Sequence, residues 1–176
     1  MVGQDTPPGT AVPWPQSAAE FESLIDVAQH RLVEFAFRRL QCRADAEDVV
    51  QDVLVRAYRD REKHRGVDNV VPFLFRMVAN RATDMLRRRR RETGPPPAAP
   101  AETGDPEAAH RLREIEAILN RLPSRQAEVI RLRVWADLPF EDVARSLGCS
   151  VPTVKSRFRY GVQKLRKALK RQGGER

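Results

Sequence analysis

The chain has 176 residues, enough for one medium domain or two small ones, and it is too polar for a single large core. Its formal charge of +8 and isoelectric point of about 10.3 favour a polyanionic partner such as nucleic acid. The two cysteines, Cys42 and Cys149, form no CxxC motif and the three histidines are scattered, which argues against a disulfide framework and a zinc site and predicts a reducing cytoplasm.

Neither a membrane span nor a targeting segment is predicted. No apolar run approaches the length of a transmembrane helix. The first residues lack the charged start and apolar core of a signal peptide. We therefore expect a soluble, cytoplasmic protein that does not insert into membranes.

Charge alternates along the chain in four segments. Residues 1–60 carry a net charge of −4, residues 61–91 of +7, residues 92–109 of −4 and residues 110–176 of +9. Basic segments alternate with acidic ones, so the surface is not expected to attract a polyanion uniformly.

Residues 1–16 are predicted to be a disordered or loosely attached leader. They contain Pro7, Pro8, Pro13 and Pro15, and Trp14 is interpreted as one aromatic residue in a flexible tail. A helix follows, because Ser17 and Glu20 form a capping-box pattern. The residues expected on its buried face are Phe21, Leu24, Ile25, Ala28, Leu32, Phe35, Ala36 and Leu40.

A second helix is predicted to open at residues 45–48, where three acidic side chains suit the positive end of the helix dipole. Its buried face would hold Val49, Val50, Val53, Leu54, Ala57 and Tyr58. Its opposite face is interpreted as a protein-binding surface, with Glu47, Gln51, Asp52, Arg56 and Arg59 exposed.

Residues 60–71 are predicted to form a polar loop around Arg65 and Gly66, and a third helix to cover residues 72–91 from Pro72. Asn80, Asp84 and Arg87 follow at spacings of four and three, so they share one helical face. Five consecutive arginines end the helix at residues 87–91, and their position beside this face favours a nucleic-acid contact over a solvated helix end. The core of this helix is expected to include Phe73, Leu74, Met77, Val78 and Leu86.

Residues 92–109 are predicted to be a linker, because their prolines and glycines are incompatible with a regular helix or strand. Such a linker would reach about 60 Å when extended and about 23–25 Å as a flexible coil. Two domains on this tether could contact DNA more than one helical turn apart, since a turn is about 34–36 Å.

A helix-turn-helix is predicted inside the second domain, residues 110–171, which leaves a tail at residues 172–176. Apolar residues at helical spacing stop at Gly148, a residue that readily adopts the left-handed backbone of a helix C-cap. Ser150 would cap the next helix. The inward stripe of that helix would be Val154, Phe158, Gly161, Leu165 and Ala168, and the preceding short helix would bury Leu138, Val143, Ala144 and Leu147.

The start of this last helix presents short polar and cationic side chains, which suits entry into the DNA major groove. Thr153 and Arg157 suit phosphates. Lys155, Ser156, Arg159 and Tyr160 suit base edges. The alternative is an ordinary helical hairpin with a solvated basic face. No strand and no internal repeat is predicted, so the fold class is all-α, with two small helical domains joined by a flexible proline-rich linker.

Two separated stretches resemble extracytoplasmic-function sigma factors of bacterial RNA polymerase, members of the sigma-70 family. AEDVVQD at residues 46–52, AY at 57–58, RG at 65–66, FL at 73–74 and NRATDMLR at 80–87 resemble sigma region 2. LP at 122–123 through VKSR at 154–157 and on to LR at 165–166 resembles region 4. The resemblance covers about residues 20–91 and 110–170, nearly all of the chain predicted to be ordered.

The resemblance implies an all-helical initiation factor that joins the polymerase core and performs no catalysis itself, without a cofactor or metal. Region 2 would bind the clamp helices of the largest subunit and open and read the minus-ten promoter element. Region 4 would bind the flap of the second-largest subunit and read the minus-thirty-five element. The family includes members held inactive by an anti-sigma factor. The polymerase contacts implied are Glu47, Asp48, Gln51 and Asp52, and the minus-ten contacts Arg65, Phe73, Asn80, Asp84, Arg87 and Arg88.

Three alternatives remain at this stage. A LuxR-type regulator shares much of the region 4 pattern but would not explain the motifs between residues 46 and 87. A nuclease could use the acids of residues 45–52 with a metal, although these acids have no partner histidines. A structural adaptor could bind the polymerase without reading DNA.

Overall fold

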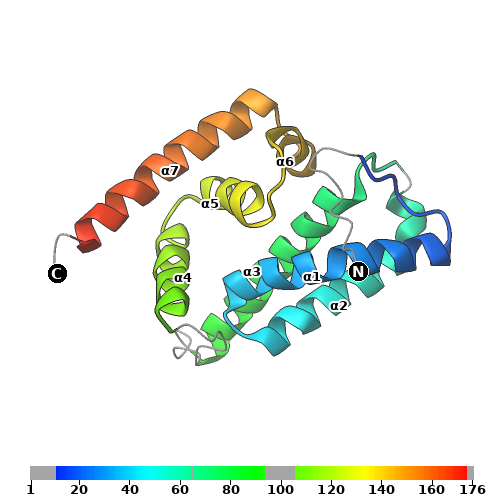
Figure 1. Cartoon of the computed structure of the whole chain (residues 1–176), viewed down its shortest axis with the longest axis horizontal. Coiled ribbons are helices and arrows are strands. Elements are labelled where there is room, and N and C mark those ends of the chain that lie inside the picture. The colour runs from blue at the N-terminus through cyan, green and yellow to red at the C-terminus, as the bar shows by residue number, and fades with distance from the viewer. Residues whose placement is uncertain (1–10, 65, 94–105, 174–176) are drawn as a thin grey trace. The chain divides into compact units, whose positions relative to one another are not determined.

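The computed structural model describes residues 11–64, 66–93 and 106–173, which fall into two compact units, residues 1–100 and 101–176. All regular elements in these ranges are helical, which confirms the all-α prediction (Figure 1). The N-terminal unit contains α1 (Ala18–Leu40), α2 (Arg43–Arg59), the 3₁₀ turn η1 (Arg61–His64) and α3 (Val70–Thr93). The C-terminal unit contains α4 (Pro106–Leu119), α5 (Ser124–Ile130), the π-helical η2 (Arg131–Trp135), α6 (Phe140–Leu147) and α7 (Val151–Gly173).

The predicted start of α1 is confirmed. The backbone N–H of Glu20 donates to Ser17 Oγ at 3.2 Å, which satisfies one of the free donors of the first turn. The carboxylate of Glu20 accepts from the backbone N–H of Gln16 at 2.7 Å, one residue before the position that a standard capping box would use. The cap therefore also holds the chain that enters the helix.

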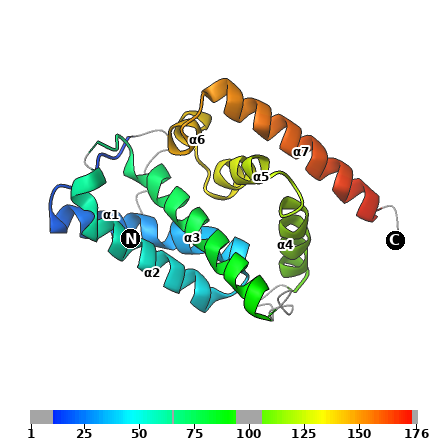
Figure 2. The ribbon, with the colours of Figure 1, turned by 180° about the vertical axis from the view of Figure 1, so that it is seen from behind.

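Helix α3 packs against α1 and α2 (Figure 2). The rings of Phe35 and Phe75 meet edge-on with centroids 5.3 Å apart in the centre of this core. Phe75 was not in the predicted buried set, because it lies one residue from the expected stripe. The prediction that Tyr58 is buried was wrong. Its side chain is 38% exposed and lies between Phe21 and Arg61 at the surface.

The prediction of a loose leader is wrong for residues 11–16. Trp14 is only 2% exposed, and its ring packs against His64 and Phe73. The backbone N–H of Val70 donates to the carbonyl of Val12 at 2.8 Å. Proline-rich composition argued for disorder, but one large aromatic side chain provides enough apolar surface to fix a short segment. Residues 1–10 lie outside the described part of the chain.

The expected linker is shorter at both ends than its composition indicated. Helix α3 continues to Thr93, and α4 begins at Pro106, since proline is accepted in the first turn of a helix. The predicted linker residues 94–105 lie outside the described part. At the C-terminus α7 reaches Gly173, two residues beyond the predicted domain end, and residues 174–176 are likewise not described.

The helix-turn-helix forms as predicted from its local signals. Gly148 adopts the left-handed conformation with φ of 60° at the end of α6. Ser150 Oγ then accepts from the backbone N–H of Thr153 at 3.3 Å and caps α7. Val143 and Val154 are fully buried where the two helices meet, and the rings of Phe140 and Phe158 pack edge-on at 5.4 Å.

Helix α7 also lies very close to α5. A Cβ atom added at the buried Gly161 would stand 2.8 Å from Ile130 Cδ1 and 3.3 Å from Gln126 Cβ. Glycine at this position therefore sets the distance between the two helices. Leu119, Ala127 and Ile130 form the core there, with Ile115, Leu122, Trp135, Phe158, Val162 and Leu165 packed around them.

A buried ion pair, which the sequence analysis missed, ties α4 to η2. Arg131 donates to Glu116 Oε1 at 2.6 Å and to Oε2 at 3.2 Å, and both side chains are less than a tenth exposed. Arg131 also donates to Asn120 Oδ1 at 3.0 Å. Breaking such a pair would leave an uncompensated charge in the interior, which is energetically costly. The pair therefore keeps α4 and η2 in a fixed position relative to each other.

Candidate nucleic-acid and protein interfaces

The predicted protein-binding face of α2 is exposed. Glu47, Asp48, Gln51 and Asp52 all lie at the surface of the helix. The sequence analysis missed Val55, which is 66% exposed and lies four residues after Gln51 on the same face. An apolar side chain at that spacing on a polar stripe was the available signal. The face thus has an apolar centre with a charged rim, the composition of a protein interface.

Two of the four acidic and amide groups on this face have partners inside the unit. Glu47 Oε1 accepts from Arg43 at 3.0 Å, and hydrogen bonds to Glu47 and Glu34 raise the pKa of the Arg43 guanidinium. Asp52 Oδ2 accepts from Arg81 Nε on α3 at 2.8 Å. Asp48 and Gln51 have no hydrogen bond or ion pair within the described residues, so they are free to meet a partner.

A shallow groove between α2 and α3 brings predicted residues of two kinds together. Asn80 and Asp84, predicted to contact DNA, are exposed beside Asp52, predicted to contact protein. Arg81, which no sequence signal distinguished, bridges the two helices here. The lining consists of Asp52, Val53, Arg56, Met77, Asn80, Arg81 and Asp84.

Phe73 lies apart from this groove. It precedes Asn80 by seven residues, which is about 10 Å along a helix axis. Its half-buried ring packs against His64 at a centroid distance of 4.7 Å and against Trp14 at 5.6 Å. The predicted minus-ten residues therefore form two groups on α3 and do not meet in one pocket. Arg65 lies outside the described residues.

The loop before α3 is held partly by charge. Lys63 Nζ donates to Asp60 Oδ1 at 2.8 Å, and this hydrogen bond lowers the pKa of the Asp60 carboxyl below its ordinary value. Both groups are at the surface, so the pair contributes little to stability. Its effect is to fold η1 back onto the end of α2.

The arginine run at the end of α3 is divided between structural and available side chains. Arg89 contacts Asp45 Oδ2 at 2.6 Å, at the start of α2. Arg88 donates to Glu92 at 2.8 Å, which raises the pKa of its guanidinium. Arg87 and Arg90 are exposed and form no ion pair with a described residue. The interpretation of the whole run as a nucleic-acid contact stays a prediction, and Arg88 and Arg89 would each first have to leave a carboxylate.

The predicted reading face of α7 lies on its first three turns. Lys155, Arg159 and Tyr160 are exposed, whereas Thr153, Ser156 and Arg157 are half-buried. Thr153 shares a hydrogen bond of 2.8 Å with Ser150. Arg157 donates to Cys149 Sγ at 3.5 Å, so its guanidinium leans back onto the turn, away from the exposed trio. Thr153 and Arg157, which make these contacts, thus form a flank of the helix, whereas Lys155, Arg159 and Tyr160 form its outward face.

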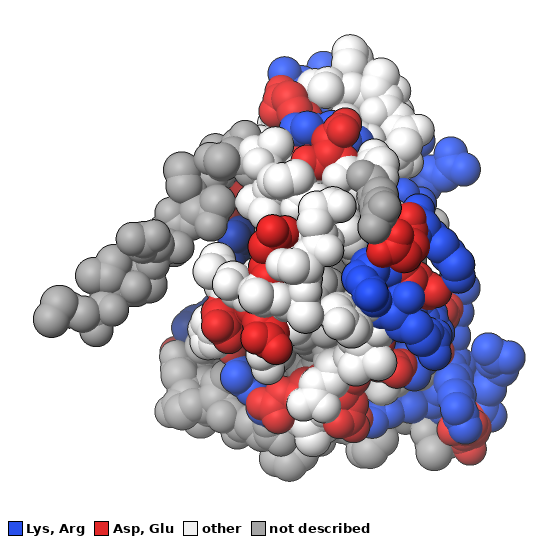
Figure 3. Space-filling view, turned by 90° about the vertical axis from the view of Figure 1, so that its right-hand side faces the viewer, with Lys and Arg blue, Asp and Glu red and all other residues white. Residues whose placement is uncertain are grey.

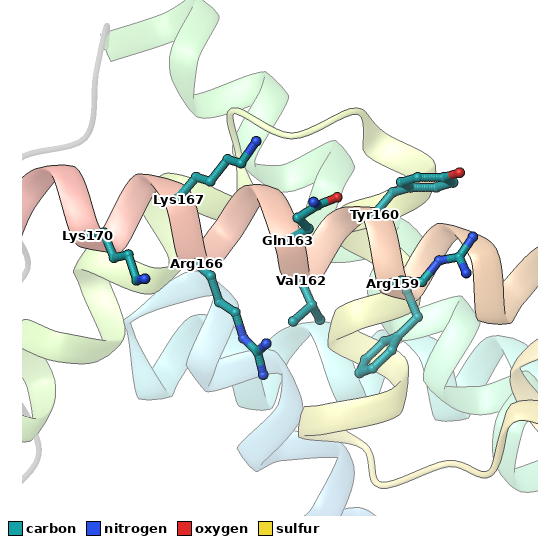
Figure 4. A pocket seen from close by; sticks show the side chains of 8 residues that line it. Arg159, Tyr160, Val162, Gln163, Arg166, Lys167 and Lys170 are labelled. Carbon is teal, nitrogen blue, oxygen red and sulfur yellow. The ribbon is translucent and has the colours of Figure 1, made fainter.

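Helix α7 is uniformly cationic. It contains eight Lys and Arg residues and no Asp or Glu, and none of these cations forms an ion pair with another described residue. Arg159 instead lies over the Tyr160 ring at 5.1 Å. Figure 4 shows Tyr160 and Lys167 projecting to one side of α7 and Arg166 to the other. A helix with no competing carboxylate suits a phosphate backbone.

Charge is not spread evenly elsewhere. On the face shown in Figure 3, basic side chains gather along one edge, and acidic ones form separate groups among uncharged residues.

Among the described residues, no group of three or more His, Cys, Asp and Glu side chains is arranged to hold a metal ion. Within the same residues, no helix is long and apolar enough to cross a membrane.

Comparisons with known proteins match both units separately. The family described as sigma-70 region 2 matches residues 24–92, and the family described as sigma-70, region 4 matches residues 112–165. The RNA polymerase sigma-E factor of Streptomyces coelicolor is 30% identical over 85% of this chain and 86% of its own length. The ECF RNA polymerase sigma factor SigE of Mycolicibacterium smegmatis is 30% identical over 97% of this chain and 71% of its length.

A solved structure is similar to this chain. The sigma factor RpoE of Bartonella quintana, in complex with the anti-sigma factor NepR, superposes with a TM-score of 0.65. It is 27% identical, and the match covers 87% of this chain and 98% of that one.

Proposed function

The chain belongs to the sigma-70 family of RNA polymerase sigma factors, in its extracytoplasmic-function group, and we propose how its two units share promoter recognition. The observation that carries the proposal is the presence of region 2 and region 4 in one chain, in that order. A LuxR-type regulator would lack the first of these. The protein works in the cytoplasm with the bacterial RNA polymerase core, which supplies the chemistry.

The N-terminal unit binds the clamp helices of the largest polymerase subunit through α2. Asp48 and Gln51 are the main polar contacts, because they are exposed and have no partner within the described chain. Val55 provides the apolar centre of the contact. Glu47 and Asp52 lie at its rim and already have partners, so each contributes less.

The same unit opens and reads the minus-ten element. Extruding a base costs a few kcal/mol of stacking, so the protein must offer groups that hold the base once it is out. Asn80 and Asp84 offer an amide and a carboxylate on the exposed side of α3, and Phe73 offers an aromatic ring. Arg87 and Arg88 hold the adjoining phosphates, Arg88 after release from Glu92. Arg65 would join them from the loop.

The C-terminal unit reads the minus-thirty-five element with α7 and binds the flap of the second-largest subunit. Lys155, Arg159 and Tyr160 project from the outward face toward base edges, with Ser156 beside them. Thr153 and Arg157 contact phosphates from the flank. An anti-sigma factor is a further partner, by analogy with the NepR complex of RpoE.

The proposal is tested first on the α2 face. Replacing both Asp48 and Gln51 with alanine should weaken binding of core polymerase at least about fivefold, since both contacts would lie in the interface centre. Val55→Asp should weaken it as well, and Val27→Asp is the matched control, because Val27 is also an exposed valine but lies on α1. Affinity is measured by titrating labelled protein with core enzyme.

Unchanged affinity in the double mutant, with normal helicity, would mean that this face is only solvated. Equal losses in Val55→Asp and Val27→Asp would point to a general effect of the new charge. Run-off transcription on genomic fragments then tests the whole function, since a sigma factor must direct initiation from defined start sites.

A further inference from the structure

We propose that residues 11–16, named here the strap, position the loop before α3 together with the start of α3, where the proposed minus-ten contact Phe73 lies, with Trp14 as the positioning residue. The loop consists of residues 60–64 and 66–69, between α2 and α3. The inference rests on the proposed function of the N-terminal unit. The strap precedes residue 24, where the match to sigma-70 region 2 begins.

Backbone hydrogen bonds attach the strap to the end of the loop. The N–H of Val70 donates to the carbonyl of Val12 at 2.8 Å, and the N–H of Val12 donates to Asn69 Oδ1 at 3.4 Å. Asn69 and Val70 are both buried. These bonds join positions nearly 60 residues apart in the sequence, so they fix where the loop enters α3.

Three aromatic rings form the centre of the contact. The centroid of Trp14 lies 5.1 Å from that of His64 and 5.6 Å from that of Phe73, and His64 and Phe73 are 4.7 Å apart. Each ring comes from a different element: the strap, η1 and α3. Trp14 therefore packs against both the 3₁₀ turn and the helix that carries the reading residues.

The other end of the strap is tied to α1. Gln16 Nε2 donates to the carbonyl of Trp14 at 2.8 Å, and the N–H of Gln16 donates to Glu20 Oε2 at 2.7 Å. The indole Nε1 of Trp14 is buried without a hydrogen-bond partner among the described residues. The ring is thus held by packing alone, and removing it should release the strap.

A held loop should improve base capture. A loop that is ordered before binding does not lose that conformational entropy when it receives an unstacked base, so the affinity for the open strand rises. Trp14 need not touch the DNA for this effect. It acts through His64 and through Phe73, the proposed aromatic contact.

The test compares Trp14→Ala and Trp14→Phe in the full chain assembled with core polymerase. The matched ligand is a single-stranded oligonucleotide that carries the minus-ten sequence of a promoter found by run-off transcription. It is compared with versions of the same strand in which bases of that sequence are substituted. Trp14→Ala should bind the matched strand about tenfold more weakly and discriminate less between the versions, because the loop is no longer pre-ordered. Trp14→Phe should retain most of the affinity and most of the base discrimination that Trp14→Ala loses. Core affinity and binding of a minus-thirty-five duplex should change less than about twofold.

A second measurement follows the strap directly. Trp135 is the only other tryptophan, so Trp135→Phe leaves Trp14 as the sole tryptophan of the chain. Its emission should be that of a buried indole in the free protein and should change when the matched strand binds.

Three results would overturn the inference. One is unaltered strand binding in Trp14→Ala. Another is an equal loss on matched and substituted strands together with weaker core binding, which would make Trp14 merely structural. The third is solvent-exposed emission from Trp14. If the wild-type holoenzyme itself shows no base preference, the proposed minus-ten function fails, and the inference fails with it.

Discussion

The two units use charge in opposite ways, and their longest helices show the difference best. Helix α3 has 24 residues and α7 has 23. On α3, Arg81, Arg88 and Arg89 each contact a carboxylate of the same unit. On α7, no cation has such a partner within the described residues. The C-terminal unit places the ion pair of Glu116 with Arg131 in the interior instead.

This contrast separates two uses of a basic side chain. A cation paired with a carboxylate must leave that partner before it can bind a phosphate, so part of the binding energy is lost. An unpaired cation on a stable helix loses no binding energy in this way. The cations of α7 are therefore available to a polyanion before it binds. Some of the cations of α3 are instead paired with carboxylates, and these pairs help to hold the N-terminal unit together.

The largest expected effect comes from the buried pair. Glu116→Gln should destabilise the C-terminal unit by about 3–5 kcal/mol, because Arg131 stays charged in the interior and meets only neutral acceptors, Asn120 and the amide oxygen of the substituted side chain. The matched control is Glu92→Gln beside Arg88, whose pair is exposed, and it should cost less than about 1 kcal/mol. Urea unfolding measures both, with Trp135 reporting on the C-terminal unit in a Trp14→Phe background and Trp14 reporting on the N-terminal unit in a Trp135→Phe background.

Similar losses in the two variants would remove the distinction between interior and surface pairs. An equal loss in the N-terminal transition of Glu116→Gln would show that the two units do not unfold separately as their division predicts.

An intermediate effect is expected within α7, between its outward face and its flank. Arg159→Ala should lose about 1–3 kcal/mol of discrimination at particular bases of the minus-thirty-five element, because Arg159 projects outward. Arg157→Ala should weaken binding to all sequences alike and reduce the salt slope by about one unit, because its guanidinium leans toward the turn. Binding curves on matched and mismatched duplexes at several salt concentrations measure both quantities. An unaltered base preference in Arg159→Ala would remove that residue from the reading set.

The smallest effect is expected at the end of α3, where two arginines differ in their partners. Arg89→Ala should cost up to about 1 kcal/mol of stability and leave the salt dependence of strand binding unchanged, because Arg89 is paired with Asp45. Arg87→Ala, at a proposed phosphate contact without an ion pair to a described residue, should leave stability unchanged and lower the salt slope by about one unit. Thermal unfolding and salt titrations of holoenzyme binding separate the two. The opposite assignment would mean that the Asp45 contact opens when DNA binds.

Local signals in the sequence were sufficient to place the start of α1 and the turn of the reading motif. Ser17, Gly148 and Ser150 act through atoms no more than four residues away, so the sequence contains the whole interaction. The buried stripe beginning at Val154 follows from helical spacing alone. Val55 was also accessible in this way, because it lies at helical spacing from Gln51.

The partners of charged and aromatic residues were decided only by the tertiary structure. Arg81 meets Asp52 across 29 positions, and Arg131 meets Glu116 across 15. Trp14 was predicted to be mobile from the prolines around it, and it is buried because η1 and α3 bring His64 and Phe73 to the same place. Composition and periodicity describe neighbours along the chain, whereas these contacts depend on how separate helices pack, and no local pattern specifies that.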